Sequence, residues 1–452
     1  MEHSPNLDLV SIDMGYGHLR PAYALSDFLG AQPILLADRP PLATEEEQKK
    51  WDQARHFYEL LSRAGRFPVV GPSLAEVLRT ITNIPSLYPL RDQSSRTPAV
   101  RFLEYMAQQG MGLGLAARLQ RSDATLLTTF YGPAILSDIH GCERIYCVVT
   151  DSDINRVWAP VNPSLGKVTY LVPSHRSRRR LRAYGVPSDR IVVTGFPLPH
   201  ELVGGVQAQF LRHNLRRRLV ALDPRGRFLR ECREEVTYFL GELPDPSETP
   251  PHLVFAVGGA GAQSELVDVF LPSLAHSLRK RSLKLTLVAG IRQEVADKFR
   301  ASIERAQLSE ELANGTVDVL VAEDHAGYFR RFNQLLAETD ILWTKPSELS
   351  FYGALGIPLL FAPPVGAHER YNRRWAMSSG AGLRQGDLPH AGQWLWEMLK
   401  DGTFAGAAWT GYMRMPKFGL YRAIEAVLGE EALGTLCEQA NARQATPLQS
   451  VG

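Results

Sequence analysis

The stretch Leu7-Asp-Leu-Val-Ser-Ile-Asp13, together with Gly15-Tyr-Gly-His18 and the segment 21–29 after it, decides the fold class. The first run is short and largely apolar, which is typical of a buried strand, and residues 21–29 have apolar side chains at helical spacing. Glycine permits the tight turn between them. Strand, glycine loop and helix in this order predict the opening of an α/β domain of the nucleotide-binding type.

Outward from this stretch, the same alternation continues in two series. Five further β-type runs belong to the first series: 33–37, 124–129, 144–150, 167–172 and 190–194. The second series opens with a strand at 252–257 and a second glycine loop, Gly258-Gly-Ala-Gly-Ala-Gln263, followed by runs at 284–289, 316–322, 340–343 and 358–362. Two such series predict two Rossmann-like domains that face an interdomain cleft.

Proline and glycine clusters indicate the domain limits. The cluster Gly195-Phe-Pro-Leu-Pro199 favours a boundary there, and residues from about 40 to 115 are helical in pattern and interrupted by prolines, which indicates a helical insertion. We therefore expect three parts: an N-terminal domain at 1–198 with the insertion at about 40–115, a C-terminal domain at 199–403, and helices at 404–452 that cross back to the first domain.

Composition excludes several classes of protein. The 452 residues are 44% hydrophobic and 22% charged, which is typical of a folded globular chain and not of a disordered or coiled-coil one. A net charge of +2 gives no electrostatic case for nucleic acid. The four cysteines have no metal-ligand spacing, and the N-terminus has no secretory pattern, so we expect a cytoplasmic protein without a metal site.

The two glycine loops suit phosphate, because a helix that begins after such a loop presents unpaired N–H groups. Neither loop has the spacing of a dinucleotide fingerprint or a P-loop. A tight turn that binds nothing remains the alternative for each loop. His18 directly follows the first loop, where its imidazole is suited to remove a proton from a hydroxyl; the alternative is a histidine that caps the next helix.

Four groups of residues resemble the GT-B glycosyltransferases of the group that contains MurG, the monogalactosyldiacylglycerol synthases and the processive diacylglycerol glucosyltransferases. The four are Ser11 to His18, Val149-Thr-Asp151 with Trp158, Gly185 to Pro197, and Asp340 to Gly382. Their order and spacing extend over about residues 7 to 383. The resemblance implies a GT-B fold with two Rossmann-like domains.

The resemblance also implies an activity and a set of site residues. The activity is an inverting, metal-independent transfer of a sugar from a UDP-sugar to an acceptor hydroxyl, with no other cofactor; the acceptor is a lipid or lipid-linked sugar at the inner membrane face. His18 and Asp151 would be catalytic, and Gly15 and Gly17 would form the acceptor-side loop. The donor would be bound by Gly259, Gly261, Lys345, Ser347, Glu348, Ser350, His368, Glu369 and Asn372.

One departure from the family pattern concerns the donor. Gly353 occupies the position of the family's ribose-binding glutamate, and two residues are missing before Gly356. Either Glu348 makes the ribose contact on a reshaped loop, or the donor site has changed or lost its ligand. The rival hypothesis is therefore a degenerate GT-B protein that binds a nucleotide-sugar or a partner without catalysis.

Three other features have two interpretations each. The arginine clusters at 176–182 and 212–218 suit either a solvated helix face or contact with an anionic membrane surface. Asp151 and Asp153 suit either a carboxylate site or a turn at the end of a strand. Ser347 and Ser350 suit either phosphate contact or N-capping of the next helix.

Overall fold

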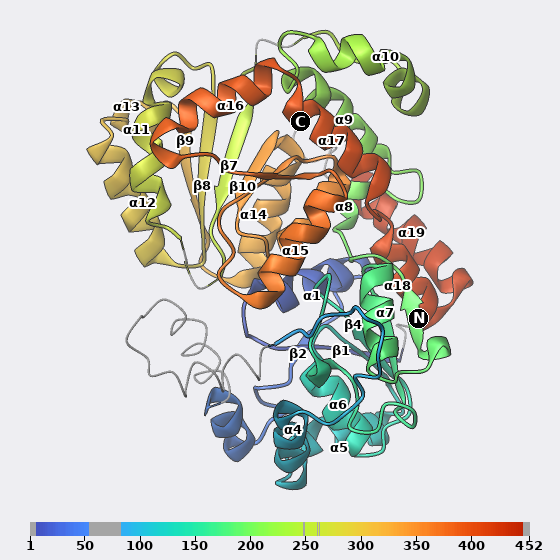
Figure 1. The fold of residues 1–452 in the computed structure, drawn as a ribbon. Coiled ribbons are helices and arrows are strands. Elements are labelled where there is room, and N and C mark those ends of the chain that lie inside the picture. The colour runs from blue at the N-terminus through green and yellow to red at the C-terminus, as the bar shows by residue number, and fades with distance from the viewer. Residues whose placement is uncertain (1–5, 54–82, 247–248, 260, 262, 446–452) are drawn as a thin grey trace. The chain divides into compact units, whose positions relative to one another are not determined.

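The computed structural model describes residues 6–53, 83–246, 249–259, 261 and 263–445 (Figure 1). The chain divides into two compact units. The first unit comprises Met1–His200, Val365–Asn372 and Phe418–Gly452, and the second comprises Glu201–Pro364 and Arg373–Lys417. Each unit is built around one parallel sheet, and the two are described in turn.

The first unit contains a parallel six-stranded sheet in the order β2-β1-β3-β4-β5-β6. Its strands are β1 (Leu7–Ser11), β2 (Ile34–Leu36), β3 (Thr125–Thr128), β4 (Ile145–Val148), β5 (Val168–Val172) and β6 (Ile191–Val193). All six lie within the predicted runs. The strand order changes direction between β1 and β3, so that this pair marks the switch point of the sheet, where the loops after neighbouring strands diverge.

Helices connect these strands, and the first of them begins earlier than predicted. The set is α1 (Tyr16–Phe28), α4 (Pro98–Gln108), α5 (Leu113–Ser122), α6 (Tyr131–Ile139), η1 (Arg156–Trp158), α7 (His175–Ala183) and η2 (Ser188–Arg190), to which α18 (Gly419–Leu428) and α19 (Glu430–Ala445) are added after the last strand of the chain. The short α8 (His200–Val203) begins at the last residue of the segment Met1–His200 and continues into the second unit. The expectation that α1 begins near Pro21 is wrong. Gly15, at φ 101°, turns the chain one residue before the helix, and Pro21 is tolerated inside it.

Part of the predicted insertion is described. Residues 45–53 are helical, and α4 and the start of α5 also lie in it. Residues 54–82 lie outside the described residues. Trp51 and Met111 form a small core with Ile12 and Phe130, so this segment packs beside the residues that follow β1 and β3.

The second unit repeats the architecture with the order β12-β11-β10-β7-β8-β9, also parallel. Its strands are β7 (His252–Ala256), β8 (Lys284–Gly290), β9 (Val317–Val321), β10 (Ile341–Thr344), β11 (Leu359–Phe361) and β12 (Gly382–Arg384). The switch point here lies between β7 and β10. The sequence predicted five of these strands and missed β12, whose three residues are too few to show a pattern.

The helices of the second unit flank this sheet, with α11 and α12 on one side and α14 on the other (Figure 1). The set is α9 (Gln209–Ala221), α10 (Arg227–Leu240), α11 (Leu266–Arg279), α12 (Gln293–Arg305), α13 (Ser309–Ala313), α14 (His325–Glu338), η3 (Glu348–Leu355), α15 (Ala367–Ser378), η4 (Leu388–His390), α16 (Ala391–Lys400) and α17 (Thr403–Arg414). The first turns of α15 belong to the first unit. The two parallel sheets with their helices are the two Rossmann-like domains that the GT-B fold requires.

One arginine of each cluster is buried, and neither interpretation of the arginine clusters applies to these two side chains. Arg180 is fully buried and its guanidinium binds the Asp153 carboxylate. Arg218 is 1% exposed and donates to the carbonyl oxygens of Thr339 and Leu355, and burial lowers its pKa to about 9. These two side chains therefore hold loops together, and neither is available to solvent or to a membrane.

Candidate functional site

His18 lies in the first turn of α1, directly after the glycine turn that ends β1. Its Nδ1 is 2.9 Å from the carbonyl oxygen of Thr129 and 3.3 Å from the hydroxyl of Thr150. Since a carbonyl oxygen only accepts, Nδ1 carries the proton and the lone pair of the neutral ring is on Nε2. The Thr129 hydroxyl donates in turn to the His18 carbonyl oxygen at 2.8 Å. Both the side chain and the main chain of His18 are therefore bonded to Thr129.

Aromatic side chains surround the imidazole. The ring centroid of His18 is 4.7 Å from that of Phe130 and 6.3 Å from that of Trp158. Tyr131 continues this cluster, 4.3 Å from Phe130, and burial raises the pKa of its phenol to about 12. The phenol therefore stays neutral at physiological pH, and the histidine lies against an apolar wall.

The residues around His18 come from neighbouring strands at the switch point of the first sheet. His18 follows β1, Thr129 follows β3, and Thr150 follows β4, which is the order of these strands in the sheet. Ligands of open α/β sheets bind outside the carboxyl ends of the strands at this point. The sequence predicted His18 but missed Thr129 and Thr150; the signal available was a threonine at the end of each predicted run.

Two carboxylates follow β4, and the structure distinguishes them. Asp153 is fully buried and both its oxygens are bound by Arg176 and Arg180. Asp151 is half-buried, and its Oδ1 accepts a hydrogen bond from the Asn372 amide at 2.8 Å. No described residue donates to its Oδ2. Asp153 is thus a structural ion-pair residue, whereas Asp151 keeps one oxygen for a ligand.

The segment Val365–Asn372, expected at the donor sugar, packs within the first unit. Asn372 is fully buried, and its Oδ1 accepts from the Ser152 N–H at 2.9 Å. Glu369 is 2% exposed and accepts from the Val365 N–H at 2.7 Å at the start of α15. His368 is half-buried and lies over Gly366. The geometry therefore gives Asn372 and Glu369 partners of their own inside this unit.

In the second unit, Lys345 lies on the glycine loop that follows β7. A Cβ added to Gly258 would lie 2.3 Å from Cε and 3.0 Å from Nζ of Lys345, so the absence of a side chain at Gly258 makes room for the lysine stem. Lys345 follows β10, and β10 pairs with β7 at the switch point of this sheet. An ammonium group beside a glycine loop in this place suits a phosphate.

A second cation lies on the other side of the same loop. The Nε of Arg292 donates to the carbonyl oxygen of Gly259, and its Cδ would be 3.5 Å from a Cβ at Gly261. Gly261 has φ 65°, which favours glycine. Gln263 closes the loop through a 2.7 Å hydrogen bond from its Nε2 to the Pro363 carbonyl oxygen. Sequence reasoning missed Arg292, whose signal was its place just after a predicted strand.

The altered donor loop forms η3. Ser347 stands at the N-cap position without a side-chain capping bond, and Glu348 at the first helical position is 7% exposed. The Ser350 hydroxyl is fully buried and has no hydrogen-bond partner among the described residues, so N-capping does not account for either serine. This loop therefore contributes the Glu348 carboxyl and, two residues later, the Ser350 hydroxyl, which has no hydrogen-bond partner among the described residues.

Gly353 is a packing residue. A Cβ there would lie 2.7 Å from Ala381 Cβ and 2.8 Å from Met415 Sδ, and a Cβ at Gly411 of α17 would lie 2.5 Å from the Gly353 carbonyl oxygen. No glutamate side chain fits at this position unless α17 moves. A ribose contact from η3 would therefore have to come from another residue, and Glu348 is the carboxyl of that element.

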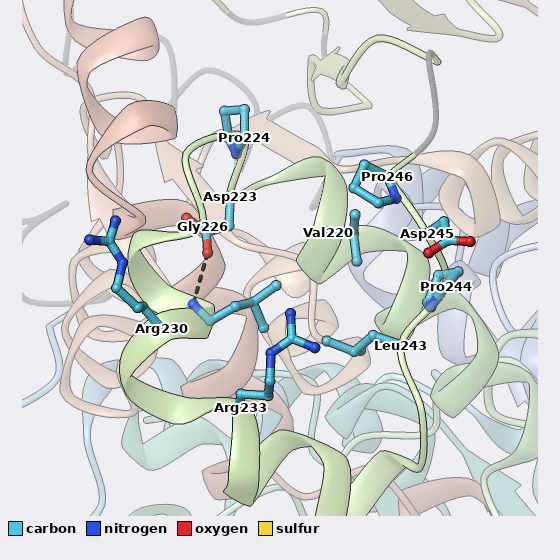
Figure 2. Close-up of a pocket in the computed structure, with 11 residues that line it drawn as sticks. Val220, Asp223, Pro224, Gly226, Arg230, Arg233, Leu243, Pro244, Asp245 and Pro246 are labelled. Carbon is cyan, nitrogen blue, oxygen red and sulfur yellow. Dashed lines mark hydrogen bonds between the residues drawn. The ribbon is translucent and has the colours of Figure 1, made fainter.

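A hollow elsewhere in the second unit contains none of the predicted site residues. Its volume is about 390 Å³, and it lies between the α9–α10 turn and residues 243–246 (Figure 2). The Asp223 carboxylate caps the start of α10 there, through the N–H groups of Arg227 and Leu229. Because these N–H groups are already bound, the hollow offers no free helix terminus to an anion.

Two features are absent from the described residues. They contain no group of three His, Cys, Asp or Glu side chains placed to hold a metal ion. Among the same residues, no helix has the length and apolar character needed to span a bilayer.

Comparison with known proteins shows solved structures with a similar arrangement of the chain but no curated protein with a similar sequence. A family model described as a domain of unknown function, DUF6938, matches residues 245–428, which is less than half of the chain. None of the curated proteins matches the sequence significantly. Sequence similarity alone therefore assigns no activity.

Three solved structures illustrate the structural similarity. MurG from Acinetobacter baumannii has a TM-score of 0.49 at 12% identity, over 94% of this chain and 100% of that one. The glycosyltransferase SnogD from Streptomyces nogalater has a TM-score of 0.44 at 15% identity, over 93% and 98%. The UDP-GlcNAc 2-epimerase from Neisseria meningitidis, bound to UDP-GlcNAc, has a TM-score of 0.43 at 11% identity, over 83% and 97%. This chain is thus similar in arrangement both to transferases and to an epimerase. These similarities assign no reaction, which depends on the site residues.

Proposed function

We propose that this protein is an inverting GT-B glycosyltransferase that moves a sugar from a UDP-sugar to an acceptor hydroxyl without a metal ion. One observation supports the proposal: His18 lies at the switch point of the first sheet, and Lys345 lies beside the glycine loop at that of the second. The first unit would hold the acceptor and the second the nucleotide-sugar.

His18 supplies the base in this proposal. With Nδ1 held as a donor by the Thr129 carbonyl, Nε2 accepts the proton of the acceptor hydroxyl. The acceptor oxygen forms a bond to the anomeric carbon as the bond from that carbon to the diphosphate oxygen breaks. Asp151 would assist by accepting a hydrogen bond from the acceptor through its Oδ2.

The second unit stabilises the leaving diphosphate. Lys345 and Arg292 are two cationic side chains beside the loop after β7, as charge developing on UDP requires. Glu348 would contact the ribose from η3, with Ser347 and Ser350 on the phosphate side. His368 and Glu369, both in the first turn of α15, would approach the donor sugar.

We further propose a lipid or lipid-linked acceptor and action at the inner face of the membrane, in the cytoplasm. Phe130, Tyr131 and Trp158 beside His18 support this, because an apolar wall suits the apolar part of such an acceptor. A soluble glycoside is the alternative acceptor, and the assay below includes both kinds.

The test is UDP release from UDP-glucose, UDP-galactose and UDP-N-acetylglucosamine, with dioleoylglycerol micelles or a p-nitrophenyl glycoside as the acceptor. We expect release by the wild type and a decrease in kcat of about 10²- to 10⁴-fold in His18→Ala. UDP affinity in calorimetry should stay unchanged, because His18 belongs to the other unit. His140→Ala is the matched control: this histidine also bonds a carbonyl oxygen, that of Met111, outside the site.

Two outcomes would contradict parts of the proposal. Full activity in His18→Ala would remove His18 from the mechanism. UDP binding without any turnover, or no UDP binding, would favour the degenerate GT-B protein, which binds without catalysis.

A further inference from the structure

The buried amide of Asn372 connects directly to the candidate catalytic carboxylate. Its Nδ2 donates to Asp151 Oδ1 at 2.8 Å, and its Oδ1 accepts from the N–H of Ser152 at 2.9 Å. Asn372 is fully buried, so both polar ends of the side chain are committed to consecutive residues of the loop after β4. Because the amide is also fully buried, it exposes no surface to a sugar.

The hydrogen bond from Asn372 fixes one oxygen of the Asp151 carboxylate and does not involve the other. Asp151 Oδ1 is taken by the amide, whereas no described residue donates to Oδ2. A carboxylate with one oxygen fixed has fewer rotamers to lose when it binds, which lowers the cost of orienting a substrate hydroxyl. Asp153, two residues away, is bound on both oxygens by arginines and has no such freedom.

From this geometry we propose that Asn372 is a positioning residue that orients Asp151 on the acceptor side, and not a donor-sugar contact. The inference rests on the proposed function, since it assigns a role within that reaction. It predicts that changes at Asn372 affect the use of the acceptor, while the KM for the UDP-sugar stays the same.

The first test compares Asn372→Ala with wild type in the UDP-release assay, with dioleoylglycerol micelles as the acceptor. We expect kcat/KM for the acceptor to fall by about 10- to 100-fold, the effect typical of a misplaced reacting group. Asn333→Ala is the control, because Asn333 is also a buried amide that bonds a carboxylate, that of Glu201 at 2.8 Å, in the second unit. The control should lower the thermal midpoint without lowering kcat/KM.

The second test exchanges the carboxylate of Asp151 and the amide of Asn372. Asn372→Asp alone brings two carboxylates to hydrogen-bonding distance and should lower both the thermal midpoint and activity. The double variant Asp151→Asn with Asn372→Asp restores an amide–carboxylate pair, and the new carboxylate can still accept from the Ser152 N–H. We expect the thermal midpoint to recover and the activity to stay low, because the carboxylate now lies at the wrong residue.

The outcomes separate this inference from the proposed function. No UDP release by the wild-type protein would overturn both. Release by the wild type with unchanged acceptor kinetics in Asn372→Ala would overturn this inference alone. So would recovery of full activity in the exchanged double variant, or a raised KM for the UDP-sugar as the sole effect of Asn372→Ala.

Discussion

Some buried titratable residues in this protein are ion-paired, whereas others have no counter-charge beside them. Asp153 and Arg180 are both fully buried and neutralise each other. His252 has no such counter-charge: it is 4% exposed, its Nε2 is 2.8 Å from the Thr286 hydroxyl, and burial lowers the pKa of its imidazole to about 3. A buried imidazole without a counter-charge makes stability depend on pH.

His252 should therefore make the second unit sensitive to acid. Between pH of about 6.5, its value in an unfolded chain, and about 3, the unfolded state binds a proton that the folded state does not, so stability falls as pH falls. From pH 7 to 4.5 the expected loss is about 2–3 kcal/mol. We expect His252→Gln to lose less over this range than wild type, as measured by urea unfolding at both pH values.

The matched control for this prediction is His390→Gln, since His390 has an exposed side chain. Its loss of stability should follow that of wild type. An equal pH dependence in wild type and His252→Gln would show that His252 does not account for the acid sensitivity.

At the scale of elements, glycines decide how closely two segments approach. Gly353 in η3 faces Gly411 in α17, and Ala381 and Met415 fill the space around it. Gly258 after β7 faces the flexible stem of Lys345. The same substitution at the two positions should have different effects, because packed neighbours cannot yield, whereas a lysine side chain can change rotamer.

Gly353→Ala should thus destabilise the protein by about 1–3 kcal/mol through overpacking, with UDP affinity little changed. Gly258→Ala should cost less stability but displace Lys345 and weaken UDP binding. Urea unfolding and calorimetry with UDP measure the two effects. Equal loss of stability in both variants, or unchanged UDP affinity in Gly258→Ala, would contradict this assignment.

At the scale of the whole molecule, the chain passes four times between the units. Its last helices, α18 and α19, belong to the first unit, and Tyr421 of α18 packs there against Phe28 and bonds His200 at 2.9 Å. The stability of the first unit therefore depends on residues more than 200 positions beyond its last strand, β6.

Tyr421→Ala should destabilise the first unit by about 3–5 kcal/mol, the usual cost of removing a buried aromatic side chain. Hydrogen exchange should rise in α1 and β1 and stay the same in β7 and β8. Phe270→Ala, a fully buried residue of the second unit, should give the reverse pattern. Faster exchange in both sheets of the Tyr421→Ala protein would show that the units do not unfold separately.

The sequence by itself determined the fold class and most of the strands, because strands of a parallel sheet are buried on both faces and read as continuous apolar runs. It also predicted His18 and Lys345, since each follows a strand at a glycine loop or a family motif. It missed β12, whose pattern is too short, and it began α1 five residues late because Pro21 suggested a helix start.

Only the tertiary structure decided what each polar residue does. In sequence only the family resemblance separates Asp151 from Asp153, whereas in the structure Asn372 bonds the first and two arginines of α7 bind the second. Gly353 is a packing residue because α17 lies against it. Hydrogen bonds and close contacts between distant segments depend on three-dimensional proximity, which the local sequence pattern does not contain. Burial of a strand on both faces, by contrast, requires a run of apolar residues that is visible in the sequence of each strand.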